Sequence, residues 1–306
     1  MNPTIEWLLQ GDISIQYLTN KYLLNEEKNK LENLRKRIAT EGWGKAFLDQ
    51  RKESGHWGVD FYLPKWINSH YTLLDLRYLE IEPVAPIQET IQRILENCKH
   101  SDGSINESRA PRSGDICVNG MFLNYAAFFA TSEKELKSVV DFLLDNTMPD
   151  GGFNCEAQRS GSVHSSMHTT ISVLEGIWEF FKSGYQYRRQ ELVKAKKDAE
   201  EFLLMHRLFK SDKTGEIIDK KWTMLSFPSR WRYDILRTLL YFADTGAPYN
   251  PRMDDAIQIL LTKRRKDGTW PVQAKHSGKV HFDMEKPGEP SRFNTLRALR
   301  VLKAYG

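Results

Sequence analysis

The stretch AIQILLTKRRKDGTW, residues 256–270, combines an apolar helical pattern with a basic turn, an Asp-Gly pair and an aromatic residue. The same order recurs in VVDFLLDNTMPDGGF, residues 139–153. Glycine tolerates the positive φ that a sharp turn after a helix requires. Each stretch therefore predicts a helix that ends at a tight turn, beyond which the chain changes direction.

Such turns recur along the chain. Five polar turns are each followed by a loop and an apolar-periodic helix, and they contain Gly55, Gly103, Gly151, Gly215 and Gly268. A more polar helix precedes most of them, and successive glycines lie 48 to 64 residues apart. Self-similarity at such a period is typical of helical repeats. The sequence predicts five helical hairpins and a further N-terminal hairpin, with helices near residues 3–10 and 13–24.

The two helices of each predicted hairpin differ in polarity. Residues 85–100, APIQETIQRILENCKH, precede a turn and carry one apolar stripe, as in a helix with one face in solvent. The helices after the turns are apolar over a wider arc and begin with polar or aromatic residues, which is typical of inner helices around a cavity. Closing the hairpins into a ring buries both end faces of the stack. We therefore expect an all-α, α/α toroid fold, with an open solenoid as the alternative.

Composition and charge are those of a globular chain. Of the 306 residues, 40% are hydrophobic, enough for one large core or two modest ones. A net charge of +4 and the lack of an arginine-rich arm argue against nucleic acid as a partner. No apolar run approaches the roughly 20 residues of a membrane span, and we expect a cytoplasmic protein. We assign residues 1–40 to N-terminal helices packed on the ring or part of it, and residues 41–306 to the toroid domain.

The cysteines are Cys98, Cys117 and Cys155, an odd number in a long chain. This number favours free thiols over a disulfide framework, and one thiol could be a metal ligand. Cys117 lies in NESRAPRSGDICVNGMFLNYAAFF, residues 106–129, where two arginines and an aspartate crowd ahead of an apolar helix. A capped helix with a buried thiol is the simplest interpretation of that stretch, and a functional site is the alternative.

The Asp-Gly-x-aromatic turn after an outer helix resembles the repeat shared by protein prenyltransferase β subunits and squalene cyclases. The resemblance covers most of the chain from about residue 40 and implies an α/α toroid. Terpene cyclases of that group protonate a double bond with a D-x-D-D motif, whereas Asp254 and Asp255 here lack the earlier aspartate. Protonation-driven cyclisation is therefore not expected.

The resemblance to the prenyltransferases also implies a zinc site. In those β subunits zinc is held by the Asp and Cys of D-x-C at one inner helix and by the His of an H-T pair at the next. The matching residues here are Asp115, Cys117 and His168. Basic residues six and three positions before that aspartate contact the substrate diphosphate in the family, and these positions are Arg109 and Arg112 here.

The residue types fit that chemistry on their own terms. Zinc prefers nitrogen and thiolate ligands, and three protein ligands leave a fourth position for water or substrate. Guanidinium groups match phosphate and carboxylate. The family's tyrosine after the cysteine is Val118 here, which weakens the case for a prenyl diphosphate as the ligand. A capped helix, a core thiol and a polar loop histidine would explain the same residues without a metal.

Further candidates lie at equivalent positions in other repeats. His70 could be a fourth ligand or general base, or a hydrogen-bonded core histidine. His164 lies four residues before His168 and is an alternate ligand, and Glu156 could act as an acid or base. The aromatic residues that would line a cavity, or else pack between helix layers, are Trp57, Trp66, Trp231 and Tyr233. Residues 272–293 lack apolar periodicity and could form a lid, which contains His276, His281 and Asp283.

Two classes of function follow. The first is a zinc-dependent enzyme, a transferase or hydrolase-like protein, acting in the ring cavity on a small anionic or isoprenoid substrate. The second is a non-catalytic toroid whose cavity or rim binds a ligand or protein. Lanthionine cyclases are a weaker resemblance, because their Cys-His-Gly metal motif is absent. The sequence leaves the substrate, the reaction and any partner subunit open.

Overall fold

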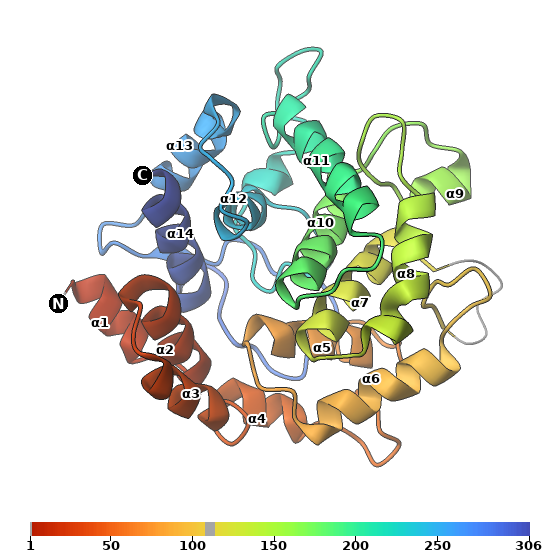
Figure 1. Ribbon diagram of the computed structural model, residues 1–306. Coiled ribbons are helices and arrows are strands. Elements are labelled where there is room, and N and C mark those ends of the chain that lie inside the picture. The colour runs from red at the N-terminus through yellow and green to blue at the C-terminus, as the bar shows by residue number, and fades with distance from the viewer. Residues whose placement is uncertain (1, 108–113) are drawn as a thin grey trace. The chain divides into compact units, whose positions relative to one another are not determined.

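The computed structural model describes residues 2–107 and 114–306. These residues form helices, one two-stranded sheet and loops, of which residues 49–68 and 272–289 are long (Figure 1). The chain folds into two compact units. The first unit comprises residues 1–50, 78–82 and 206–306, and the second comprises residues 51–77 and 83–205. The sequence division near residue 40 stays a prediction.

The second unit contains the helices of two complete hairpins. An outer helix, a glycine turn and an inner helix follow one another twice, and α7 packs against both α8 and α10. The helices are α5 (Ser69–Tyr78, whose last residue belongs to the first unit), α6 (Ala85–Asn97), α7 (Ile116–Phe128), α8 (Glu133–Asp145), α9 (Glu156–Ser160), α10 (Met167–Lys182) and α11 (Arg189–Met205). The predicted alternation of outer and inner helices is confirmed here, because α7 is buried along nearly its whole length whereas α6 and α8 each bury one stripe.

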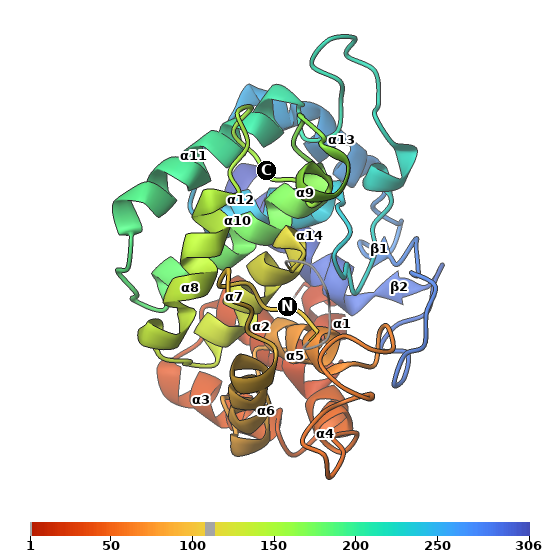
Figure 2. The same cartoon turned by 90° about the vertical axis from the view of Figure 1, so that its right-hand side faces the viewer.

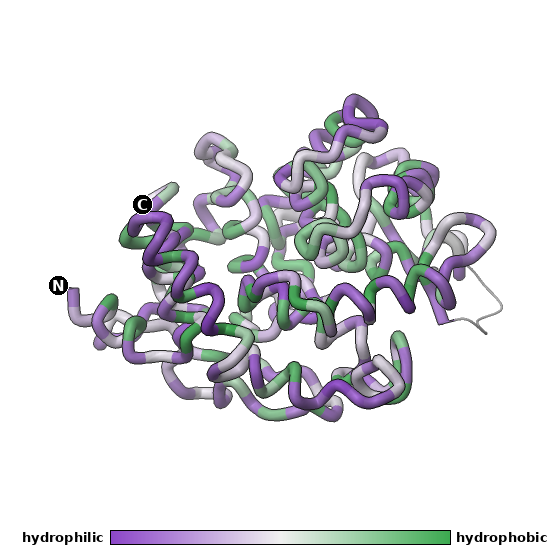
Figure 3. Tube along the Cα trace, turned by 60° about the horizontal axis from the view of Figure 1, so that its bottom comes forward, coloured by the Kyte–Doolittle hydropathy of each residue, from purple (hydrophilic) through white to green (hydrophobic). Residues whose placement is uncertain are grey.

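The first unit joins the two ends of the chain. Its last helix packs against α12 and also against α2, so the final hairpin meets the N-terminal helices. The elements are α1 (Pro3–Leu9), α2 (Ile13–Thr19), the π-helical η1 (Asn20–Leu24), α3 (Lys28–Arg37), α4 (Gly42–Leu48), η2 (Lys220–Thr223), α12 (Ile235–Asp244), η3 (Pro251–Met253), α13 (Asp254–Thr262), β1 (Trp270–Pro271), β2 (Pro290–Ser291) and α14 (Arg292–Tyr305). The trace of α14, which ends at the C-terminus, alternates between hydrophilic and hydrophobic residues (Figure 3). The two ends of the chain therefore pack together within this unit.

The sheet and the helices α3, α4 and α9 were not expected from the sequence. Strands β1 and β2 pair antiparallel, with Trp270 opposite Ser291, and lead into α14 (Figure 2). They lie at the two ends of residues 272–293, the segment proposed as a lid. Helix α3 has no fully buried side chain and carries only a short apolar face: Leu31 and Leu34 are partly buried, and Ile38, directly after the helix, is fully buried. Such a short face is a weak signal for a helix.

All five glycines of the predicted turns have positive φ, between 73° and 95°. In four of the turns, the residue two positions after the glycine is fully buried and its N–H donates to a side-chain oxygen of the following inner helix. Trp57 donates to Ser69 Oγ at 3.1 Å and Ile105 to Asn119 Oδ1 at 2.7 Å. Phe153 donates to Thr170 Oγ1 at 3.0 Å and Trp270 to Thr295 Oγ1 at 2.9 Å. We call these four contacts the turn-to-helix hydrogen bonds.

The turn at Gly215 departs from the other four. In those four turns the glycine N–H bonds the carbonyl three residues earlier, as Gly151 does with Met148 at 2.9 Å. Gly215 instead bonds Ser211, four residues earlier, at 2.8 Å. This turn is therefore one residue longer, and it is also the turn at which the repeat spacing is widest.

Helices α7 and α10 approach unusually closely. A Cβ on Gly120 would lie 2.7 Å from the Cα of Val173, and one on Gly176 would lie 2.3 Å from the carbonyl oxygen of Gly120. Only glycine permits this crossing, because any side chain would push the backbones apart. A buried ion pair lies farther along the two helices, where Arg77 reaches Glu179 at 2.6 Å and Asn124 at 2.9 Å.

The described part of the chain has no helix that combines the length and apolar character needed to cross a membrane.

The turn-to-helix hydrogen bonds give a test of the fold. Thr170→Val keeps the side-chain shape but leaves the buried Phe153 N–H without its acceptor, so we expect a loss of about 1–3 kcal/mol in the free energy of unfolding. Thr238→Val is the matched control. That threonine is equally buried, but its hydroxyl donates to the Asp234 carbonyl of its own helix, so no N–H loses an acceptor. Urea denaturation of both variants measures the difference, and equal losses would contradict this role.

Candidate functional site

Two thiols meet at the starts of neighbouring segments in the second unit. Cys117 is the second residue of α7, and Cys155 immediately precedes α9. The backbone N–H of Cys117 donates to Cys155 Sγ at 3.3 Å. Both thiols are partly exposed and neither forms a disulfide. Two cysteines separated by 38 residues in the sequence are thus brought together by packing.

The surroundings of Cys155 favour its thiolate form. The neighbouring Cys117 thiol donates a hydrogen bond, the Thr169 hydroxyl lies 3.5 Å from Cys155 Sγ, and the Cys117 N–H adds a third contact. These donors lower the pKa of Cys155 to about 7, and the Cys117 thiol has the largest effect. Burial acts in the opposite direction. The same thiol–thiol contact, with burial, raises the pKa of Cys117. Cys155 is therefore the thiol of the pair that ionises first, and it does so near neutral pH.

An ion-pair network flanks the thiols. Asp115, the residue before α7, pairs with Arg159 of α9, which also contacts Glu156 at 3.1 Å. The side chains of Asp115 and Arg159 are 28% and 29% exposed, so solvent and small solutes can reach both groups. Glu156, a candidate acid or base from the sequence, thus contacts the arginine that holds Asp115.

The predicted zinc ligands are only partly assembled. Among residues 2–107 and 114–306, no group of three or more His, Cys, Asp or Glu side chains is arranged to hold a metal ion. Asp115 is engaged by Arg159. His168 is the second residue of α10 and precedes Thr169, whose hydroxyl reaches Cys155, so the start of α10 does lie at the thiol pair. The chemistry of the donors suits zinc, and the zinc site stays a prediction.

His70 is fully buried among aromatic rings. Its Nδ1 lies 3.2 Å from the Tyr125 hydroxyl, and its Nε2 has no partner in the described chain. Burial, with a smaller effect of the Lys65 charge, lowers the pKa of His70 to about 3, so the imidazole is neutral. The ring of Tyr62 lies 5.5 Å from that of His70. Burial first, and then the nearby Cys117, raises the pKa of Tyr62.

The other predicted site residues are placed as follows. His164 is exposed, and its carbonyl accepts from Asn154 at 2.7 Å. Trp57 is fully buried, and Trp66 packs edge-on against Tyr71 at 4.6 Å. In the first unit, Tyr233 is buried and donates to the Leu208 carbonyl at 2.5 Å, and Trp231 lies under the guanidinium of Arg232. Arg109 and Arg112 lie outside the described residues.

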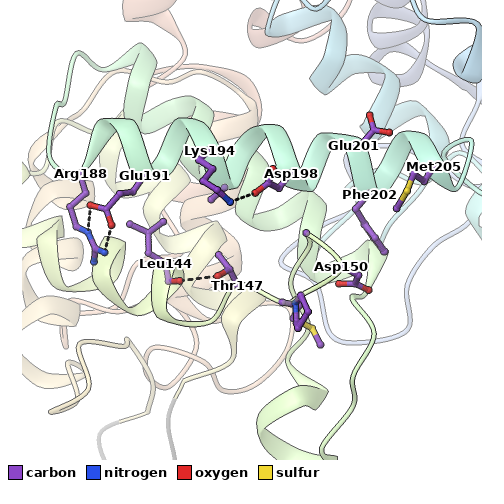
Figure 4. A pocket seen from close by; sticks show the side chains of 14 residues that line it. Leu144, Thr147, Asp150, Arg188, Glu191, Lys194, Asp198, Glu201, Phe202 and Met205 are labelled. Atoms are coloured by element: carbon purple, nitrogen blue, oxygen red, sulfur yellow. Dashed lines mark hydrogen bonds and ion pairs between the residues drawn. The ribbon is translucent and has the colours of Figure 1, made fainter.

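A separate groove runs between α8 and α11, with a volume of about 780 Å³. Figure 4 shows that its charged side chains face one another along α11. Arg188 pairs with Glu191 at 2.5 Å and Lys194 with Asp198 at 2.7 Å. These two pairs satisfy four of the charged side chains at the groove, and Asp150, also in its lining, accepts from Ser165.

Comparison with known proteins gives the fold. No family model matches the sequence, and no curated protein matches it. A glycosyl hydrolase family 88 protein from Bacteroides vulgatus is similar in structure, with a TM-score of 0.51 and 11% identity over 94% of this chain and 88% of that chain. The chain has the α/α toroid fold. The fold class predicted from the glycine repeat is thereby confirmed.

Two other solved structures are less similar. A protein from Actinoplanes has a TM-score of 0.47 and 12% identity over 95% of this chain and 89% of that chain. The type II terpene cyclase MstE from Scytonema has a TM-score of 0.36 and 15% identity over 90% of this chain and 98% of that chain.

Sequence reasoning missed Cys155, Thr169, Arg159 and Tyr62 as members of the site. One signal was present for Cys155. It lies two residues after Phe153, the donor of one turn-to-helix hydrogen bond, and Cys117 lies two residues before Asn119, the acceptor of the bond in the preceding repeat. Packing of adjacent repeats places these positions together. Arg159 and Tyr62 lie in loops or short helices without periodicity, where the sequence carries no comparable signal.

The lowered pKa of Cys155 predicts selective modification. In chelator-treated protein, alkylation of Cys155 by iodoacetamide should rise with pH and reach half its maximum near pH 7, because the thiolate is the nucleophile. Peptide mass spectrometry reports each cysteine separately, and the buried Cys98 should react slowly throughout. Thr169→Val removes one donor to the thiolate and should move the midpoint upward. A wild-type midpoint near the ordinary value of about 8.5 would contradict the assignment.

Proposed function

We propose that this chain is a toroid enzyme with a zinc–thiolate centre formed by Cys117 and Cys155, acting on a small anionic substrate. Asp115 and His168, predicted from the sequence, are the further candidate ligands. The observation that carries the proposal is the contact between the two thiols, made by segments 38 residues apart. Adjacent cysteines in a chain without a disulfide framework commonly serve as metal ligands or catalytic groups.

The donor set supports the choice of zinc. Two thiolates with either a nitrogen or a carboxylate as third ligand suit a borderline-soft cation and leave the fourth position of a tetrahedral centre for water or substrate. The pKa of Cys155 is lowered to about 7 without a metal, so part of this thiol is already deprotonated at neutral pH. When bound, zinc would hold the thiolates deprotonated and supply a Lewis acid.

The residues around the thiols support an anionic substrate. Asp115 can ligate a metal only if its ion pair with Arg159 opens, and opening that pair frees the guanidinium to meet a carboxylate or phosphate. Glu156 remains beside Arg159 and limits how much positive charge is exposed. Arg109 and Arg112, which the sequence places shortly before Asp115, are proposed to add to the same anion contacts. A substrate with an isoprenoid tail remains one member of this class.

The structural neighbours support the enzyme class but not the reaction. The named neighbours include a glycosyl hydrolase and a terpene cyclase, so the toroid fold is used by enzymes of different chemistry. The function here is therefore argued from the thiol site and not from the fold. A non-catalytic ligand-binding toroid is the competing class.

Metal analysis tests the proposal. Protein purified without added metal should contain about one zinc per chain by mass spectrometry, because the site is built from preferred zinc donors. Cys117→Ser and Cys155→Ser should each lower the zinc content at least about ten-fold. Cys98→Ser is the matched control, because Cys98 is buried away from this pair, and it should keep the wild-type content.

Two results would oppose the zinc centre. Wild-type protein that holds no zinc even after equilibration with the metal would rule it out, as would equal zinc content in all three serine variants. Metal-free protein that instead forms a reversible Cys117–Cys155 disulfide would favour thiol redox chemistry, because a thiolate next to a thiol is the arrangement that such chemistry needs.

A further inference from the structure

We propose that the first unit contains a second anion-binding site, centred on Arg297 of α14, for a phosphate or carboxylate group. The site shares no residue with the thiol centre and does not depend on the zinc proposal. The proposal rests on the Arg297 guanidinium, which is buried and whose hydrogen-bond partners are neutral. The following contacts define it.

Arg297 is 9% exposed and makes no ion pair among the described residues. Its Nη1 donates to the Ser226 carbonyl at 3.3 Å and lies 3.3 Å from Asn294 Oδ1. Both contacts are long, and both acceptors are neutral. Removing a guanidinium from water costs several kcal/mol unless a charged partner compensates for it. The remaining donors of Arg297 are therefore suited to an anion from outside the chain.

The carboxylates next to this network are bonded to other groups. Glu285 accepts from Ser291 Oγ and, at 3.0 Å, from the Phe293 N–H. Asp234 is 1% exposed. It accepts from Ser226 Oγ at 2.9 Å, Ser229 Oγ at 3.4 Å and the Arg237 N–H at 2.8 Å. These three donors are neutral groups that cap the start of α12. The carboxylate thus serves the helix start, and it does not bond Arg297.

Further positive charge gathers around the same loop. Arg230 is 5% exposed and Arg237 is 2% exposed, and Arg237 Nη1 donates to the carbonyls of Arg230 and Arg232. Arg232 Nε is buried and has no hydrogen-bond partner within the described chain. His281 is affected by this charge, because burial, together with Arg230 and Lys279, lowers its pKa to about 4.

Aromatic rings flank the two neutral partners of Arg297. Phe227, next to Ser226, and Phe293, next to Asn294, stack with ring centroids 3.8 Å apart. Trp43 stacks on the other side of Phe293 at 5.7 Å and is partly exposed. An anion attached to a flat or apolar group could bind Arg297 and contact these rings. The ligand class is therefore an organic phosphate or carboxylate, whose anionic group is recognised first.

Calorimetric titration of the full-length protein tests this site with inorganic phosphate, diphosphate and benzoate, each against chloride at matched ionic strength. We expect saturable binding of at least one of these anions and a rise in the unfolding temperature with its concentration. Arg297→Gln should weaken that binding at least about ten-fold, because a charge-assisted pair is lost. Arg297→Met should raise the unfolding temperature without anion, because a buried charge without a counter-ion is removed.

Arg300→Gln is the matched control on the same helix. Arg300 is similarly buried, at 12% exposure, but it pairs with Asp244, so its loss should leave anion affinity unchanged. Cys117→Ser should also bind the anion as wild type does, which separates this site from the zinc centre. If Arg297→Gln does not fold, Arg297→Lys keeps the charge without the planar two-donor geometry and should bind several-fold more weakly.

The proposal is overturned if wild-type protein binds none of the three anions. It is also overturned if the Arg297 variants bind as tightly as Arg300→Gln, or if Arg297→Met lowers the unfolding temperature of the anion-free protein.

Discussion

The structure depends on the hydrogen bond that ties each glycine turn to the helix after it. In four repeats a buried N–H two residues beyond the glycine meets a Ser, Asn or Thr oxygen on the inner helix, as with Phe153 and Thr170. A buried N–H without an acceptor is costly, so the bond fixes where the inner helix begins relative to the turn. The positive φ of the glycine and this single acceptor together define the repeat. Hydrophobic packing of the inner helices then fills the space between repeats.

The thiol site follows from that repeat geometry and from one close helix crossing. Cys117 lies two residues before Asn119, the acceptor of one turn-to-helix hydrogen bond. Cys155 lies two residues after Phe153, the donor of the turn-to-helix hydrogen bond in the next repeat. Gly120 and Gly176 let α7 and α10 approach until backbone meets backbone. The starts of the two segments are then close enough for the Cys117 N–H to reach Cys155 Sγ. The unusual pKa of Cys155 is therefore a consequence of packing between repeats as much as of its own loop.

Features of the fold that repeat along the chain could be predicted from the sequence, whereas contacts that occur only once could not. Glycine turns, apolar arcs and the inner and outer helices recur, so the toroid class could be predicted. Helix α3 left only a weak pattern, because Leu31 and Leu34 are the apolar residues within it and both are only partly buried. The Asp115–Arg159 pair joins residues 44 positions apart through a short helix, which no local pattern encodes. His70 has the position expected of a ligand, but it is enclosed by aromatic rings that come from two segments, and only the folded structure reveals that its imidazole is neutral.

Structural and functional polar groups are separated by only a few residues in this fold. Asn119, Thr170 and Thr295 hold the turns, and their neutral oxygens are well matched to the N–H groups they accept. Cys117, Thr169 and Arg297 lie one or two residues away on the same inner helices, and none of them takes part in a turn-to-helix hydrogen bond. Because the repeat is already held by neutral pairs, the fold does not require a thiolate or an arginine at these positions. Reactive and charged groups that a fold does not need, and that it keeps partly buried at a cost, are best explained by the ligands they bind.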